Sequence, residues 1–352
     1  MKFKITKIFL AIFTILATIS FLNSNAFAFD DNEILIPNAL KKGDKVCLLS
    51  MSYVAPWSNT NFYKERSKVA INKLKSYGLE VEFYDESFKA SEFVGDDTAE
   101  IRANMFNKAV KDKSIKAIFD IYGGLCAIQT LDKIDYEAFR ENKKIFVGYS
   151  DASIVGQAIF KKSGVITFHG PMPGASYHLN ETLCFDNLFD ILMNPKSEFE
   201  LKNIDDNTPF KVYKEGNCEG RIVGGNHWEM QHLMGTPFEI EFENKIFFFE
   251  DNWSCVSKGE AYRVNSAMWQ MLILNKNIEK LSGIIAGPLT RPGIKNEEIY
   301  RNSVFKTFEN SKIPVLYNFH VGHINNPLTV PVGAKAKIEN GRVFIMQPVV
   351  QK

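Results

Sequence analysis

The sequence has few of the features that mark membrane proteins or nucleic-acid-binding proteins. Beyond residue 28 no apolar run is long enough to cross a bilayer, so that part of the chain is predicted to be soluble. Basic and acidic residues nearly balance, at 42 and 41, and this excludes the basic footprint expected of a nucleic-acid-binding protein. The chain also has no internal repeat and no low-complexity tract.

Cysteine and histidine are scarce. The five cysteines have no zinc-motif spacing, and their odd number leaves at least one unpaired, although an oxidising compartment would allow one or two disulfides. His320-x-x-His323 and the pair His227 and His232 are closely spaced, but neither forms a helical His-Glu-x-x-His motif. We therefore predict no metal and no cofactor. Four histidines are predicted to be structural or site-lining: His169, His178, His227 and His232.

Residues 1–28 have the three parts of a secretory signal peptide. Three lysines precede an apolar run from Ile8 to Leu22, and Ala26-Phe27-Ala28 supplies a small-x-small cleavage site. The alternative is an uncleaved membrane anchor, for which the run is short. Cleavage after Ala28 removes three of the 42 basic residues and leaves 39 against 41 acidic ones. These features predict export to the periplasm.

Residues 29–193 are predicted to form an α/β domain with a mostly parallel sheet flanked by helices, because short apolar strands alternate with amphipathic helices. Sites in such sheets lie at the carboxyl ends of the strands, where Gly123-Gly124 and Ser150 both fall. The predicted strands are 45–50, 79–84, 115–121, 145–149 and 165–168, and the predicted helices include 62–77, 98–110 and 152–162.

The segment around Ser150 has the pattern of a strand, a tight turn and a helix. The apolar run Ile145–Val147 ends on Gly148, and helical periodicity begins at Ala152. A nucleophile elbow has this arrangement: its turn exposes the serine hydroxyl, and the helix N-terminus favours developing negative charge. Gly148 and Ala152 are small where strand and helix approach closely, although the usual Gly-x-Ser-x-Gly motif has glycine at its fifth position, where this chain has Ala152. The alternative is that Ser150 only caps the helix.

The second half has a different texture. A polar stretch, residues 194–217, is predicted to be a linker. Residues 218–352 are predicted to form a smaller, β-rich α+β domain with a barrel-like end. It includes strands at 245–249 and 283–287 and a helix at 261–274. Alternating runs over 328–346 surround a hairpin turn at Asn340-Gly341.

These motifs together resemble the serine LD-carboxypeptidases, a family that includes the microcin C7 self-immunity peptidases. The resemblance covers most of the chain beyond residue 28, and its strength lies in the shared order and spacing of motifs that are weak singly. The matching motifs are Lys42-Gly43-Asp44, Tyr122-Gly123-Gly124, Phe146–Asp151, Phe168–Pro171, Gly224-Gly225-Asn226, Gly235–Pro237, Phe249–Asp251, Gly322-His323 and Leu328–Pro331.

The resemblance implies a catalytic triad of Ser150, His323 and Glu250. A serine hydroxyl is a poor nucleophile until an imidazole removes its proton, and the imidazole needs a carboxylate to fix its tautomer. Glu250 ends an apolar strand of the second domain, and His323 follows Gly322 near the end of the chain. Asp251 is the alternative carboxylate, because adjacent strand residues point to opposite sides and only one can face inward.

The resemblance also implies an oxyanion hole made by the backbone N–H groups of Gly124 and Asp151. Gly123, Leu125 and Asn226 are implied to contact the substrate.

The chain departs from the family after this glycine pair. Family members often have Gly-Gly-Tyr-Gly followed shortly by an arginine, whereas residues 123–129 here read Gly-Gly-Leu-Cys-Ala-Ile-Gln. The missing arginine affects the expected substrate preference rather than bond cleavage. Cys126 is a rival nucleophile, although it lies outside the strand-turn-helix apex.

The resemblance implies a periplasmic LD-carboxypeptidase that releases the terminal D-Ala from murein tetrapeptides, in peptidoglycan remodelling or recycling. Its partner is then a murein peptide, and a homodimer is allowed because similar proteins are often dimers. One alternative is a muropeptide- or solute-binding protein without catalysis. Others are a microcin-type amidase of peptidyl nucleotides and a peptidase that also cuts crosslinked murein.

Overall fold

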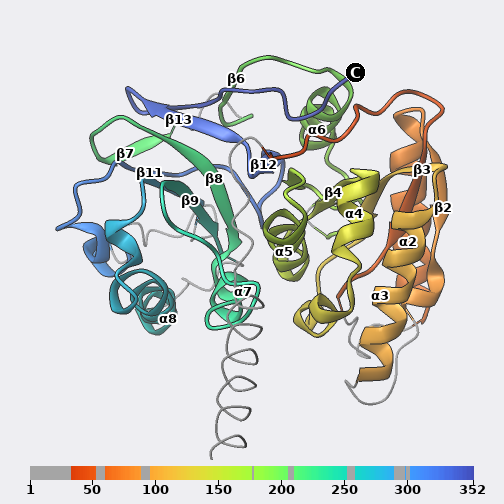
Figure 1. Cartoon of the computed structure of the whole chain (residues 1–352), viewed down its shortest axis with the longest axis horizontal. Helices are drawn as coiled ribbons and strands as arrows, with labels where there is room; N and C mark the ends of the chain where they lie inside the picture. Colours follow the sequence, from red (N-terminus) through yellow and green to blue (C-terminus); the bar gives the residue numbers. More distant parts are fainter. Residues whose placement is uncertain are drawn as a thin grey trace, which may run out of the picture.

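The protein has two β-sheets with helices between and around them (Figure 1). The computed structural model describes residues 33–52, 60–88, 96–176, 178–204, 210–251, 258–288, 298 and 302–352. The predicted signal peptide, residues 1–28, lies outside the described residues. None of the helices in the described ranges has the length and apolar character needed to traverse a bilayer.

The first sheet has six strands in the order β12-β5-β4-β3-β1-β2. Its first five strands along the chain pair in parallel, which confirms the predicted parallel sheet, and β12 adds antiparallel to the edge at β5. All four residues of β4 are buried, as expected for a strand covered on both faces. The strands are β1 (Lys45–Leu49), β2 (Glu80–Phe83), β3 (Ile115–Asp120), β4 (Ile145–Gly148), β5 (Thr167–His169) and β12 (Val330–Val332).

Helices cover both faces of this sheet. α3, α4 and α5 contact one another in turn and form one layer, and Figure 1 shows α5 of this layer between the two sheets. α2 lies with α6 on the opposite face, where Tyr77, directly after α2, donates to Asp186 and stacks on Phe189. Nine of the eleven residues of α5 are buried, because both of its faces contact protein. The helices are α2 (Thr60–Ser76), α3 (Asp96–Lys111), α4 (Tyr136–Asn142), α5 (Ser153–Ser163) and α6 (Leu183–Met193).

The second sheet has eight strands in the order β6-β14-β13-β8-β9-β10-β11-β7. The four strands β8 to β11 pair in parallel, and the outer pairings are antiparallel. Asn340 and Gly341 both have positive φ, at 51° and 72°, in the predicted hairpin turn. The strands are β6 (Phe199–Leu201), β7 (Lys211–Lys214), β8 (Cys218–Asn226), β9 (Lys245–Glu250), β10 (Gly283–Ala286), β11 (Val315–Tyr317), β13 (Lys335–Glu339) and β14 (Arg342–Ile345).

The polar stretch 194–217, predicted as a linker, contains two of these strands. β6 pairs with β14 and β7 pairs with β11, so the stretch supplies both edges of the second sheet. Its described part is therefore not a free connection. The reason is that the neighbouring strands present backbone N–H and C=O groups that an extended segment can pair, whatever its own β propensity.

Helices of the second half lie at the carboxyl ends of its parallel strands. α7 (His227–His232) follows β8 directly, and α8 (Lys258–Met268) continues into a π-helical turn, Trp269–Leu274. Short 3₁₀ turns complete the structure: Asp85–Phe88, Ala127–Lys133, Ser150–Ala152, Asn277–Glu279 and Phe305–Phe308.

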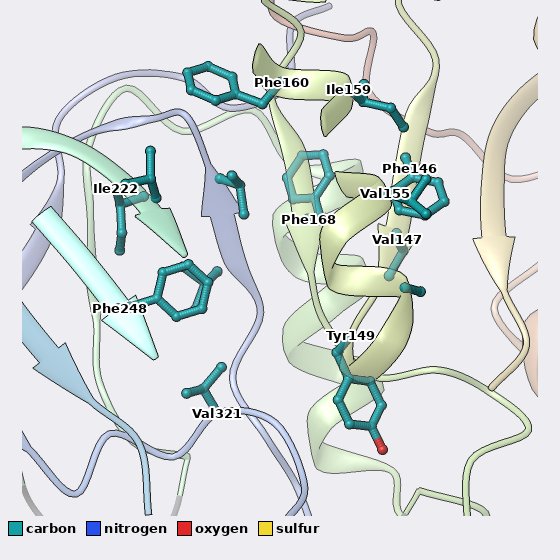
Figure 2. Packing of buried hydrophobic residues seen from close by; sticks show 14 of the residues in the cluster. Phe146, Val147, Tyr149, Val155, Ile159, Phe160, Phe168, Ile222, Phe248 and Val321 are labelled. Carbon is teal, nitrogen blue, oxygen red and sulfur yellow. The ribbon is translucent and has the colours of Figure 1, made fainter. Parts of the chain in front are cut away.

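The two sheets share a hydrophobic core through α5 and β5. Figure 2 shows that Phe160 and Phe168 lie on the part of the first half that faces Ile222 and Phe248 of the second sheet. All four residues are buried. A Cβ on Gly333 would lie 2.2 Å from the Phe160 ring, so glycine is needed where the chain passes over α5. This packing fixes the ends of β4, β8 and β9 beside one another.

Candidate active site

Ser150 lies at the apex of the turn between β4 and α5. Its φ is 60°, in the left-handed region that costs a non-glycine residue about 1–2 kcal/mol. The turn is tight, because a Cβ on Gly148 would lie 3.0 Å from the Cβ of Ala152. Ser150 is half-buried, and its hydroxyl contacts a histidine rather than capping the helix. The alternative that Ser150 is only a helix cap is therefore wrong.

The structure brings Ser150, His323 and Glu250 into a line of contacts. Ser150 Oγ lies 3.0 Å from His323 Nε2, and His323 Nδ1 lies 2.8 Å from Glu250 Oε2. Ser150 comes from the first half, Glu250 ends β9 of the second sheet, and His323 lies on the loop 318–329 between β11 and β12. In this arrangement the His323 imidazole can remove the proton of Ser150 while the Glu250 carboxylate stabilises the imidazolium that forms.

Glu250 is fully buried and held by several donors. The backbone N–H of His323 donates to Oε2 over 3.3 Å, and Asn226 Nδ2 donates to Oε1 over 3.1 Å. Burial alone would raise the pKa of Glu250, but the His323 imidazole and these hydrogen bonds outweigh it, so the pKa lies below its usual value. A Cβ on Gly322 would lie 2.0 Å from Glu250 Oε2, so only glycine fits there.

Asp251, the alternative partner of His323, has a different contact. Its Oδ1 lies 3.4 Å from His227 Nδ1, and both side chains are 2% exposed. The alternation along the strand thus sends the two neighbouring carboxylates to two different histidines. Glu250 is the one that contacts His323.

Asn226 was implied to contact substrate, but it is only 4% exposed and both polar ends of its side chain bind within the protein. Its Oδ1 accepts from the backbone N–H groups of Trp228 and Glu229 and so caps α7. Its Nδ2 donates to Glu250. This placement makes Asn226 a support for the carboxylate.

The loop after β3 lies against the serine turn. A Cβ on Gly123 would lie 2.9 Å from Ser150 Oγ and 3.7 Å from the backbone N of Asp151. Gly124 is exposed, and so is Leu125, which has an exposed fraction of 50%. Gly123, Gly124 and Leu125, which were implied to contribute to the oxyanion hole and the substrate contacts, therefore lie on a loop that borders Ser150.

Cys126, the rival nucleophile, lies on this loop with φ of 67°. Burial, and then the nearby Asp151, raise the pKa of its thiol. A thiol that stays protonated is a weaker nucleophile than a thiolate, so the environment of Cys126 opposes that role.

Two family models match the chain, one in each half. Residues 51–170 match the LD-carboxypeptidase N-terminal domain, and residues 219–338 match the LD-carboxypeptidase C-terminal domain. The chain belongs to the LD-carboxypeptidase family. The two matched ranges contain Ser150, in the first, and Glu250 and His323, in the second.

Several proteins similar to this family member are known. A probable murein peptide carboxypeptidase of Bacillus subtilis (strain 168) is 27% identical over 309 residues, which cover 85% of this chain and 90% of that protein. The microcin C7 self-immunity protein of Escherichia coli is 29% identical over 277 residues, covering 71% and 78%. The crystal structure of an MccF-like protein from Bacillus anthracis has the same fold, with a TM-score of 0.77 at 24% identity over 89% of this chain and 99% of that one.

Behind His323 lies an aromatic cluster that the sequence does not reveal. The Tyr149 ring packs edge-on against the His323 ring, with centroids 4.9 Å apart, and also contacts the rings of His178 and His169. Burial lowers the pKa of His169 to about 4 and that of His178 to about 3, so both are neutral. They line the site as uncharged rings.

The buried ionisable residues that sequence reasoning missed include two near the site, Arg102 on α3 and Asp120 at the end of β3. Arg102 stands on the apolar face of its helix, three residues after Ala99 and four before Phe106. The sequence signal that could have identified Arg102 is a charged residue among the apolar residues of one helix face.

Metal ligands and disulfides can be assessed only in part. Among the described residues, no three histidine, cysteine, aspartate or glutamate side chains are grouped so that they could hold a metal ion. Four of the five cysteines lie in the described ranges, and each is a free thiol: Cys47, Cys126, Cys184 and Cys218.

Proposed function

We propose that this chain is a serine-type LD-carboxypeptidase that releases the terminal D-Ala from murein tetrapeptides. The observation that carries the proposal is the contact line from Ser150 through His323 to Glu250, with the serine on a strained turn. Membership of the LD-carboxypeptidase family supports the reaction class. The Bacillus subtilis relative, a probable murein peptide carboxypeptidase, supports the substrate class.

In the proposed reaction, His323 Nε2 takes the proton of Ser150 while Oγ attacks the carbonyl carbon of the peptide bond that precedes D-Ala. The oxyanion is stabilised by backbone N–H groups of Gly124 and Asp151. His323 then protonates the leaving amine, D-Ala departs, and an acyl-enzyme remains on Ser150. His323 next activates a water molecule, which hydrolyses the ester and regenerates the serine.

The bond to be cut joins a meso-diaminopimelate or L-Lys residue to D-Ala. Its two sides have opposite stereochemistry, so a site built for L,L peptides would misplace the carbonyl relative to its nucleophile. We propose that the reaction takes place in the periplasm, where murein lies, because residues 1–28 have the pattern of a secretory signal peptide.

The proposal is tested by incubating residues 29–352 with a disaccharide-tetrapeptide and following the products by mass spectrometry, with Ser150→Ala in parallel. Loss of one D-Ala with the wild type alone is the expected result. An unchanged tetrapeptide that nevertheless binds would overturn the proposal in favour of a muropeptide-binding protein. A crosslinked muropeptide in the same assay shows whether endopeptidase cleavage occurs as well.

A second candidate is hydrolysis of a peptidyl nucleotide. It is favoured by the 29% identity to the microcin C7 self-immunity protein, and it is disfavoured by the predicted signal peptide. An aminoacyl sulfamoyl adenosine offered beside the tetrapeptide separates the two. Cleavage of the nucleotide conjugate alone would replace the murein proposal.

A further inference from the structure

Three buried ionisable side chains tie together the loops that leave the first sheet beside Ser150. Asp120 ends β3, Asp151 follows the serine, and Arg102 projects from α3. Their exposed fractions are 0%, 2% and 2%. Charges are seldom buried so fully unless they bind one another or backbone groups. Arg102 Nε donates to Thr98 O within α3, and the other partners described below lie in the segments that follow β1 and β3.

Asp151 stands in the first turn of the 3₁₀ helix Ser150–Ala152, where an aspartate can bind backbone groups near it in the chain. Its side chain instead reaches another loop: Oδ2 accepts from the backbone N–H of Ala127 over 3.0 Å. Ala127 lies immediately after the segment 123–126, which borders Ser150. The carboxylate therefore links the serine turn to the loop that follows β3.

Arg102 holds the same loop from the other side. Its Nη1 donates to the carbonyl oxygen of Cys126 over 3.3 Å and also to the carbonyl of Met51 after β1. Asp120 completes the connection, because its Oδ2 accepts from the backbone N–H of Met51 over 3.0 Å. The loops after β1, β3 and β4 are thus joined through backbone groups.

The segment 123–126 needs such support, because its geometry is demanding. Cys126 has φ of 67°, a left-handed conformation that is strained for a non-glycine residue. Gly123 lies so close to Ser150 that an added Cβ would be 2.8 Å from the serine Cβ. A strained conformation persists only where its surroundings specify it, and here Asp151 and Arg102 bind the backbone on both sides of the Cys126–Ala127 peptide bond.

We propose that Asp151 is a positioning residue. Its carboxylate binds the Ala127 N–H and, together with Arg102, fixes segment 123–126 so that the Gly124 N–H faces the substrate carbonyl. This inference rests on the proposed function. Stability alone explains the cluster poorly, since replacing a buried ionic group by apolar residues is often neutral or stabilising. In this cluster the Arg102 guanidinium lies near both Asp120 and Asp151, and Glu229 adds a third carboxyl group near Asp151, so the acidic groups outnumber the basic one.

The test compares Asp151→Ala with Asp151→Asn. Alanine keeps the backbone N–H of residue 151 but removes the acceptor for Ala127, whereas asparagine keeps an acceptor oxygen. With the tetrapeptide, Asp151→Ala is expected to lower kcat about 10²-fold, the scale of losing one oxyanion donor. KM is expected to change less than about threefold, and Asp151→Asn should recover most of the loss.

Labelling of Ser150 with a fluorophosphonate gives a readout that does not depend on murein. Its end point counts the folded sites, and its rate reports the oxyanion hole, so the rate should fall with kcat. Asn277→Ala is the control for a lost buried hydrogen bond, because Asn277 is 5% exposed and donates to Met271 O over 2.8 Å in the second half. It should lower Tm without changing kcat per labelled site.

An Asp151→Ala variant with kcat and labelling rate per site within about threefold of the wild type would overturn the inference. So would an Asp151→Asn variant no faster than Asp151→Ala. If the wild type is labelled but leaves the tetrapeptide intact, the proposed function fails, while the labelling rates still decide the role of Asp151. A wild type that is not labelled at all overturns both.

Discussion

Replacing Glu250 by glutamine isolates the role of its charge, because the two side chains have almost the same shape. Glu250 Oε1 accepts from Asn226 Nδ2, and Oε2 accepts from His323 Nδ1. Asn226 cannot easily turn its amide round, since its Oδ1 already accepts from two backbone N–H groups at the start of α7. The glutamine oxygen is therefore expected to stay with Asn226 at 3.1 Å, at the loss of the longer 3.3 Å bond from the His323 backbone N–H, and its NH₂ group then faces His323 Nδ1.

This orientation imposes the wrong tautomer on His323. Nδ1 becomes the acceptor and Nε2 carries the proton, so Nε2 cannot take the proton of Ser150. The imidazolium also loses its counter-charge: two unit charges 2.8 Å apart at an effective dielectric constant of about 20 attract by about 6 kcal/mol. We expect kcat to fall about 10⁴-fold, which is about 5.4 kcal/mol of transition-state stabilisation.

The assay is D-Ala release from the tetrapeptide at saturating substrate, with Tm measured on the same samples. Asp251→Asn is the matched control, since it neutralises the adjacent buried carboxylate, which contacts His227. Its kcat should stay within about tenfold of the wild type. Glu250→Gln activity above a tenth of the wild type, or an equal loss in Asp251→Asn, would refute the reasoning.

A double variant, Glu250→Gln with Asn226→Asp, sharpens the test. An aspartate at 226 can accept both from the α7 backbone and from the glutamine NH₂ group. The glutamine oxygen then faces His323 and restores the tautomer but not the charge. We expect kcat to recover by at least about tenfold over Glu250→Gln alone. The absence of any recovery would show that charge, and not tautomer, causes the loss.

Three other predictions follow from backbone strain and burial. Ser150→Gly should be more stable to urea than Ser150→Ala by about 0.5–1 kcal/mol, because only glycine adopts φ near 60° without cost; equal stabilities would contradict this. Gly322→Ala should lower kcat about 10²-fold or more by displacing Glu250, whereas Gly235→Ala, with φ of 74° and no atom within 4 Å, should cost stability alone. Burial raises the pKa of Asp120 from 3.8 to about 8, so the folded protein binds this proton more tightly than the unfolded chain does. The stabilising contribution of this proton is complete below about pH 4 and is lost as the pH rises to about 8. Asp120→Asn should therefore flatten the decline in unfolding free energy between about pH 5 and 8. An unchanged slope of unfolding free energy against pH would count against the argument.

Much of the first sheet could be predicted from sequence because its signals are local. The buried parallel strands are short apolar runs, and the segments that follow them have the apolar spacing of amphipathic helices. The serine turn is equally local, since Gly148, Ser150 and Ala152 lie within five residues. The hairpin at Asn340-Gly341 is another local signal, because both residues tolerate positive φ.

The missed elements depend on partners that are distant in sequence. β6 and β7 lie in a polar stretch and form by pairing with strands more than a hundred residues away. β12 belongs to the first sheet although it comes from the last part of the chain. Propensity gives little information about such edge strands, since the pairing energy comes from the neighbour.

The candidate site shows the same division. Ser150 was predicted from the local strand-turn-helix pattern, whereas Glu250 and His323 were implied by the resemblance to the family. The choice of Glu250 over Asp251 needed the geometry of the strand end. The support from Asn226 was not visible in the sequence either, because an asparagine after two glycines has no signature that separates a substrate contact from a helix cap. Buried charges such as Arg102 show up only once the helix face is known.

The loop 318–329 gives the molecule a mechanical property. At one end it leaves β11 of the second sheet, and at the other it enters β12 of the first, with His323 between. Asn203 pins its early part through Asn318 O and His320 N, each over 2.8 Å. Any hinge movement that separated the sheets would pull on both ends of this tether and carry the imidazole away from Ser150. The contact between the base and the serine therefore depends on how firmly the two sheets are held together.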